Sequence, residues 1–343
     1  LSACSLGMAA LQQAETALYP ARGPHPALHS VLRLADLEGL PPWFTGLDAN
    51  SDGDATLGDV IVTADYAGPA TPGSYGSNNV GAIRDNLTGE AANITGDQVS
   101  LRAGSGIGDG VAPNDADIDV AIVTLAAVTE SGDIHVQDLA GGLAIDSFDG
   151  LSGVTITDAL NNNSAGDHIT IRASSPLTVS TGDPVVNNDG GNIVLAAEGN
   201  AAGDDLTLDD NVTATGGSGN ISLYAGDTIS LTGTITVSAA GSGAVLGMAG
   251  TNYNNATPAN GTNAGDVSMA DGTTIQSADG NITLRAPGNV SLSIVNANSN
   301  SDAALGDVIV TADYAGVGGG LSNNTGAISD NLTGEGANIT GDQ

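Results

Sequence analysis

Short stretches of alternating apolar and polar residues recur along most of this chain, and each begins with Gly followed by Asp or Asn. Examples start at Gly166 (GDHITIRA), Gly219 (GNISLYA) and Gly280 (GNITLRA). A period of two is typical of a β-strand with one buried face, and a Gly-Asx pair before it is typical of a tight turn. The pattern predicts many strands of about five residues joined by short turns, with no helical spacing between them.

The alternation also assigns one face to each side chain, because successive residues of a strand point to opposite sides. We expect the apolar positions to be buried, among them Ile221, Leu223, Ile282 and Leu284. The strand arginines fall on the opposite face, and we expect all three to be exposed: Arg102, Arg172 and Arg285.

A longer repeat contains this short one: residues 47–98 return as residues 295–343. Leu57 to Gly68 and Leu305 to Gly316 are the same twelve residues, LGDVIVTADYAG. The offset is 305 − 57 = 248 here and 331 − 86 = 245 from Asn331 onward, so three residues are missing between the two matches. Loops accept such deletions and strands do not. We interpret the chain as one long repeat and the opening of the next.

These features predict an all-β protein, a right-handed parallel β-helix (β-solenoid) over residues 47–343. Stacked coils suit the composition, because aromatic residues are only 3% of the chain and small side chains can fill a thin core. A tandem array of β-sandwiches is the alternative, although sandwiches use more aromatic anchors.

Residues 1–46 do not follow the pattern and are expected to form an N-terminal cap or docking segment. Leu6 to Leu18 could form a short amphipathic helix, and Trp43 and Phe44 would supply aromatic anchors. Solenoids need caps because an open end exposes both core and strand edges. We expect the last coil, Leu305 to Gln343, to contact another chain or another repeat, with residues 1–46 as the natural partner surface.

The charge balance changes the list of partners. Six arginines, no lysine and 39 acidic residues give a net charge of −33. Such a surface repels nucleic acid and anionic lipid and attracts divalent cations. No apolar run is long enough to span a membrane. The single cysteine, Cys4, excludes an internal disulfide.

The sharpest local motif is DANSDGDATLGD, residues 48–59. It matches the calcium loop of EF-hands, and the expected ligands are Asp48, Asn50, Asp52, Asp54 and Asp59. Two observations favour an ordinary turn instead: a strand rather than a helix follows, and the second copy, residues 296–307, has lost two carboxylates and the glycine. Both interpretations stay open, and calcium is the one cofactor that the sequence suggests.

Residues 99–295 resemble the bacterial β-strand-repeat surface proteins of the filamentous-haemagglutinin-like group. The resemblance is carried by segments such as SLRAGSGIGDG at Ser100, GDHITIRASSPLTV at Gly166 and GNISLYAGDTISLTGTITVSAAG at Gly219. It implies a secreted or surface-displayed β-helix that acts in adhesion, filaments or matrix, with self-association end to end and host or matrix glycans as partners. It supplies no catalytic residues.

We therefore expect a non-enzymatic, extracellular structural or adhesive repeat protein. The alternative is a β-helix polysaccharide-degrading enzyme or a carbohydrate-binding module. An enzyme of that kind needs clustered carboxylates beside Arg or Lys. In this sequence lysine is absent, the strand arginines are scattered, and turns explain paired acids such as Asp204-Asp205 and Asp209-Asp210.

Overall fold

The computed structural model divides the chain into two units, Leu1–Ser30 and Val31–Gln343, and all of the residues described below lie in the second. The structure describes residues 31–34, 43–44, 47–49, 58–64, 66, 81–85, 87, 89–108, 117–158, 166–199, 201–251, 253, 265–301, 306–314, 325–334 and 336–341. For residues 31–34 and 43–44 only the strand pairing is described.

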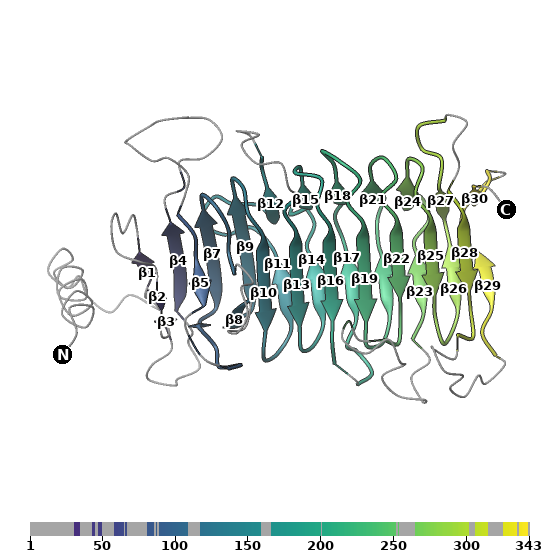
Figure 1. Ribbon diagram of the computed structural model, residues 1–343. Helices are drawn as coiled ribbons and strands as arrows, with labels where there is room; N and C mark the ends of the chain where they lie inside the picture. Colours follow the sequence, from purple (N-terminus) through teal and green to yellow (C-terminus); the bar gives the residue numbers. More distant parts are fainter. Residues whose placement is uncertain are drawn as a thin grey trace, which may run out of the picture. The chain divides into compact units, whose positions relative to one another are not determined.

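The described part of the second unit is all-β, and its strands run parallel side by side in stacked coils (Figure 1). This is a parallel β-helix, as the sequence predicts. One sheet has ten strands, namely β3 (Leu47–Asp48), β6 (Ile94–Thr95), β8 (Ile118–Ala121), β10 (Ile134–Asp138), β13 (Ile169–Ala173), β16 (Ile193–Ala197), β19 (Ile221–Ala225), β22 (Val245–Met248), β25 (Ile282–Arg285) and β28 (Val308–Thr311).

The other large sheet has eighteen strands in two columns that share their first members. The shared strands are β1 (Val31–Leu34), β4 (Asp59–Ala64), β7 (Gln98–Ala103) and β9 (Thr124–Thr129). One column is β11 (Leu143–Ile145), β14 (Leu177–Val179), β17 (Leu206–Leu208), β20 (Ile229–Leu231), β23 (Val267–Met269), β26 (Val290–Leu292) and β29 (Ile328–Asp330). The other is β12 (Val154–Ile156), β15 (Val185–Asn187), β18 (Val212–Ala214), β21 (Thr236–Ala239), β24 (Thr274–Ser277), β27 (Ile294–Asn296) and β30 (Ile339–Thr340). A separate pair joins β2 (Trp43–Phe44) and β5 (Arg84–Asp85).

From β10 onward every coil has the same plan. One strand of four or five residues in the ten-stranded sheet, which we call the straight strand, is followed by two strands of two to four residues in the eighteen-stranded sheet, which we call the split pair. Before β10 the plan is reversed. The straight strands β4, β7 and β9 lie in the eighteen-stranded sheet, and the short strands β6 and β8 lie in the other.

The reversal occurs between β9 and β10, which are consecutive straight strands separated only by residues 130–133. β9 pairs with both members of the next split pair, β11 and β12. β10 in turn pairs with β8 and, through a parallel bridge from Ile134, with Ile107. We call this half-coil change the phase shift. Because of it, the two copies of the long repeat lie on opposite sheets: β4 is in the eighteen-stranded sheet and its counterpart β28 in the ten-stranded one.

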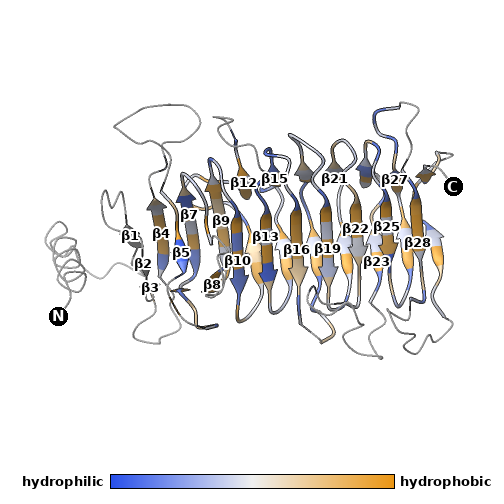
Figure 2. Ribbon diagram, in the orientation of Figure 1, coloured by the Kyte–Doolittle hydropathy of each residue, from blue (hydrophilic) through white to orange (hydrophobic). Residues whose placement is uncertain are grey.

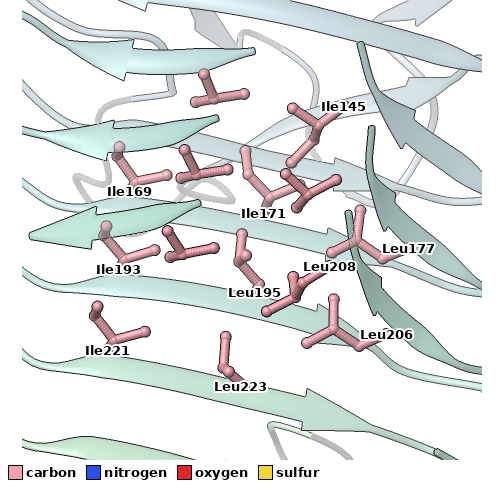
Figure 3. Close-up of a cluster of buried hydrophobic side chains, with 14 of the residues drawn as sticks. Ile145, Ile169, Ile171, Leu177, Ile193, Leu195, Leu206, Leu208, Ile221 and Leu223 are labelled. Atoms are coloured by element: carbon pink, nitrogen blue, oxygen red, sulfur yellow. The ribbon is translucent and has the colours of Figure 1, made fainter. Parts of the chain in front are cut away.

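The core is a thin column of stacked aliphatic side chains between the sheets, and the strands carry hydrophobic and hydrophilic residues in alternation (Figure 2). In Figure 3, Ile169, Ile193 and Ile221 stack in one file and Ile171, Leu195 and Leu223 in the next, facing Leu177 and Leu206 of the opposite sheet. Each such side chain contributes about 1.5–3 kcal/mol when fully buried. Stacking like on like lets isoleucine, leucine and valine fill the core without large rings.

The predicted buried positions are confirmed: the exposed fractions of Ile221, Leu223, Ile282 and Leu284 are 0–1%. The prediction of exposed arginines is wrong in degree, because all three are half-buried. Arg102 reaches Asp149 at 2.8 Å, Arg172 reaches Glu198 at 2.8 Å, and Arg285 lies over the Tyr314 ring at 5.0 Å. They point outward, but long side chains lie flat against a sheet face and pair there.

The strand ladder begins before the domain boundary expected at residue 46, since β1 pairs with β4 and β2 with β5. The short helix expected at Leu6 to Leu18 lies outside the described residues.

Candidate functional site

The two copies of the long repeat fold locally in the same way. In the first copy Asp85 Oδ1 accepts hydrogen bonds from the Leu87 backbone N–H and the Asn93 side chain, at 2.6 and 2.5 Å. In the second copy Asp330 Oδ1 accepts the corresponding bonds from Leu332 and Asn338, at 2.7 and 2.8 Å. These bonds hold the pKa of the Asp330 carboxyl below its usual value. The same local sequence therefore forms the same hydrogen-bonded loop in both copies, although the two loops lie on different sheets. We call this loop, residues 85–93 and 330–338, the excursion.

The connection before the straight strand is also reproduced. The Gly58 N–H donates to Ala49 O at 3.1 Å, and the Gly306 N–H donates to Ala297 O at 3.0 Å. A glycine closes each loop from the next coil: a Cβ on Gly96 would lie 2.8 Å from Gly58 O, and one on Gly341 would lie 2.8 Å from Gly306 O. Only glycine fits at either place.

The copies differ in what covers them. β4 lies between β1 and β7, and β6 lies between β3 and β8. Their counterparts β28 and β30 pair on one side with β25 and β27, and β29, the counterpart of residues 83–85, pairs on one side with β26. No described strand pairs with the other side of these three strands. We call these three strands the open edge; they lie at the C-terminal end of the stack (Figure 1).

The open edge carries three of the most exposed large apolar residues among those described. Ile309 is 45% exposed, Ile328 is 53% and Ile339 is 47%. Their first-copy counterparts Ile61, Ile83 and Ile94 are 6%, 0% and 1% exposed. An unpaired strand edge with apolar side chains on it is a template for adding another strand. This edge can therefore accept main-chain hydrogen bonds and bury apolar surface together.

A row of side-chain hydrogen bonds between coils ends at the open edge. Asn192, Asn220 and Asn281 each accept, through Oδ1, a backbone N–H of the following coil, at 2.8–2.9 Å. The last of these donors is the N–H of Asp307, so Asp307 holds the next position in this row. A carboxylate there is an acceptor for the N–H of a strand laid on the open edge.

Other turn acids also accept a backbone N–H from an adjacent coil, either the following or the preceding one. Asp133 accepts the His168 N–H at 2.6 Å, Asp266 accepts the Asn289 N–H at 2.6 Å, and Asp227 accepts the Gly203 N–H at 3.0 Å. A backbone N–H bonded to a carboxylate offsets part of the repulsion between acids of adjacent coils. This role was missed in the sequence, which indicates turns but not which coil each side chain would reach.

The candidate calcium loop is described only at its ends. Asp48 is exposed at the end of β3, and Asp59 begins β4, so strands flank the loop on both sides. The expected ligands Asn50, Asp52 and Asp54 lie outside the described residues. In the second copy Asn296 Oδ1 accepts the Asn298 N–H at 3.0 Å, which is a turn stabilised by its own side chain. Among described residues no group of three or more His, Cys, Asp or Glu side chains is arranged to hold a metal ion.

A polar cluster lies on the outer face of the ten-stranded sheet and bears on the alternative function, a polysaccharide-degrading enzyme or carbohydrate-binding module. The sequence indicated scattered arginines, but Arg172 lies beside two carboxylates. Arg172 donates to Glu198 Oε2 through Nε at 3.0 Å and Nη2 at 2.8 Å, and Nη1 lies 3.5 Å from Asp117. Two coils further along, Tyr224 packs edge-on against Tyr253, with ring centroids 5.4 Å apart. The guanidinium is neutralised by its own carboxylates, so a bound acidic sugar would have to compete with them.

Two buried acids are Asp138, next to the phase shift, and Asp183, which lies between the two strands of a split pair. Asp138 ends β10, is 1% exposed and accepts the Ile122 N–H at 3.4 Å. Burial raises the pKa of Asp138 to about 7. Burial, followed by a hydrogen bond with Asp146, also raises the pKa of Asp183. A pKa of about 7 leaves the Asp138 carboxyl partly protonated near neutral pH.

Within the part of the chain that the structure describes, no helix is long and apolar enough to cross a membrane. No protein-family model, no curated protein and no solved structure matches this chain.

Proposed function

We propose that this chain is a structural segment of an extracellular or surface-displayed β-solenoid, which lengthens end to end through the open edge. The observation that supports the proposal is the contrast within the molecule. The same strands are covered on both sides in the first copy and on one side in the second. Each coil of a solenoid contacts mainly the coils on either side of it, so added coils lengthen the rod without requiring a new fold.

The composition supports an extracellular structural role as well. A net charge of −33 with no lysine keeps a long rod soluble and keeps it away from nucleic acid and anionic lipid. The turn acids also make divalent cations such as calcium suitable partners of the assembly.

The test is the mass of the protein in solution as a function of concentration, measured by light scattering with and without millimolar calcium. We expect the mass to rise with concentration, because an open edge without its covering coil can pair with a strand edge of a second molecule. Ile328→Asp and Ile339→Asp introduce charges on the open edge and should keep the protein monomeric. Val123→Asp is the matched control, because Val123 is 48% exposed but lies before β9, away from the open edge. A protein that remains monomeric at every concentration contradicts the proposal.

A second candidate, binding or cleavage of polysaccharide, is favoured by the Arg172, Glu198 and Asp117 cluster and by the Tyr224–Tyr253 pair on the same sheet face, two coils from Arg172. Carboxylates can act as acid and base on a sugar, and an exposed tyrosine can stack on its ring. Release of reducing sugar from plant and bacterial glycans, lost in Glu198→Gln, would favour this function. Glycan binding without cleavage, lost in Tyr253→Ala, would favour an adhesive module.

A further inference from the structure

We propose that the open edge is the seat for one particular coil, the sequence Gln98–Ala121, supplied by a further copy of the repeat joined on the same polypeptide. The inference rests on the proposed end-to-end function and names the partner of that site.

The first copy shows what covers these strands when they are covered. β7 lies on β4, with Val60 opposite Val99 and Val62 opposite Leu101. Ile107 bridges to Ile83. β8 lies on β6, with Ile94 opposite Val120. All of these contacts come from the one coil Gln98–Ala121, which closes the whole edge of the first copy.

The same pairing can be transferred to the open edge residue by residue. Val99 and Leu101 of the added coil would lie opposite Val308 and Val310, with Ser100 opposite Ile309. Ile107 would cover Ile328, and Val120 would cover Ile339. Ile107 and Val120 are 0% exposed where they cover the first copy, so the same side chains would be buried against Ile328 and Ile339 in the second. The counterpart of β7 would join the ten-stranded sheet, since β28 lies in that sheet.

Two further hydrogen bonds specify this coil. Asn93 Oδ1 accepts the backbone N–H of Asp119 at 2.8 Å, and the Asn93 N–H donates to Asp119 O at 2.8 Å. Asn338 is the counterpart of Asn93, and its side-chain Nδ2 donates to Ser293 O, in the preceding coil, at 3.0 Å. By analogy with Asn93, Asn338 Oδ1 would accept the backbone N–H of Asp119 in an added coil.

The geometry favours a joined copy over a separate folded molecule as the source. In the folded chain β7 is paired on one side with β4 and on the other with β9. The coil Gln98–Ala121 of another folded molecule is therefore not free to dock. A copy that continues the polypeptide can lay this coil on the open edge before its own next coil forms.

The experiment extends the chain after Gln343 with a second copy of residues 99–131, in a Cys4→Ser background. Ile309→Cys is paired with Ser100→Cys in the added copy, and the matched control pairs Ile309→Cys with Arg102→Cys two residues further on. Neighbouring strands bring paired Cα atoms close enough for a disulfide, whereas a two-residue shift does not. An extension of the same residues in shuffled order controls for length and composition.

We expect the in-register disulfide to form at least tenfold faster than the shifted one. Amide exchange of Val308–Thr311 should slow by about a hundredfold or more in the extended chain and not in the shuffled one. Equal rates for both disulfides, or unchanged exchange, would overturn the inference. Cross-linking of Ile309→Cys between two extended molecules would overturn the joined copy as the source.

The two proposals fail separately. An extended chain that locks in register while the original chain stays monomeric contradicts assembly between separate molecules and leaves the assignment of the coil intact. An original chain that associates, with an extension that does not lock, contradicts the assignment of the coil alone.

Discussion

Leu57 to Gly68 and Leu305 to Gly316 have one sequence, but Ile61 is 6% exposed and Ile309 is 45% exposed. The hydrogen bonds inside each copy are the same, from the Asp85 excursion to the Gly58 loop closure. The difference therefore lies in the neighbouring coil and not in the local sequence. In a solenoid, local structure is set by the residues of a coil, whereas burial is set by the coil stacked on it.

The largest test of this comparison is a matched pair of truncations. Ile83→Ala should lower the free energy of unfolding by about 2–5 kcal/mol, because it leaves a cavity under a covering coil. Ile328→Ala, at the equivalent position, should cost less than about 1 kcal/mol because its side chain is exposed. Urea denaturation of both variants measures the difference. Equal losses would mean that the open edge is covered in solution.

The acid at the phase shift gives the next largest effect. The pKa of Asp138 is raised to about 7, above its unfolded value near 4, so the folded state keeps this proton and stability falls as the pH rises from about 4 to 7. Asp138→Asn keeps an acceptor for the Ile122 N–H and removes the buried charge. At pH 8 we expect this variant to be more stable by about 2 kcal/mol.

The advantage of Asp138→Asn should shrink toward zero near pH 4, where both proteins are uncharged at this position. Thermal denaturation at pH 4, 6 and 8 measures this trend. An advantage that is independent of pH would show that packing, and not ionisation, explains the effect. Asp149→Asn, at an exposed residue whose carboxylate pairs with Arg102, is a control that should not gain stability.

A smaller difference in stability is expected between the alanine variants of Asn93 and of its counterpart Asn338. Asn93→Ala removes the acceptor for the buried Asp119 N–H and should cost about 1–3 kcal/mol. Asn338→Ala loses only bonds to its own coil and the preceding coil, at a partly exposed position, and should cost less than about 1 kcal/mol. In the extended chain, which supplies the covering coil, the cost of Asn338→Ala should rise toward that of Asn93→Ala.

The smallest expected effect concerns calcium. It would distinguish the copies by their ability to bind a cation, because residues 296–307 lack two of the carboxylates of residues 48–59. If residues 48–59 bind calcium, millimolar calcium should stabilise the protein by about 1 kcal/mol through mass action, and sodium chloride of the same ionic strength should do less. Asp52→Ala with Asp54→Ala should abolish the gain. Asn300→Ala, at the position of Asp52 in the second copy, should leave it unchanged. Equal effects of the two salts would indicate screening alone.

Much of the fold could be predicted because its rules are local. Alternation with period two identified Ile221 and Leu284 as core residues, and the Gly-Asx pairs located the turns. The arginines were misjudged because their exposure depends on acids in other coils, such as Glu198 for Arg172. The use of Asp133 and Asp266 as backbone acceptors was missed for the same reason.

The phase shift could not have been predicted either. It depends on four residues, 130–133, that join one straight strand to another without the usual split pair. No feature of those residues distinguishes this turn from the turns around it. The repeat showed that Ile309 and Ile61 are equivalent, but only the stacking order could show that one is covered and the other is not.

The phase shift also sets the symmetry of any array made from this repeat. Each copy contains one half-coil reversal, so the same residues return on the opposite side of the rod after each repeat, as β4 and β28 already do. An array with a sequence period of one repeat would have a structural period of two, like a twofold screw axis along the rod. A ligand or partner bound to one loop of the repeat would then alternate between two sides, which doubles the axial distance between neighbours on the same side.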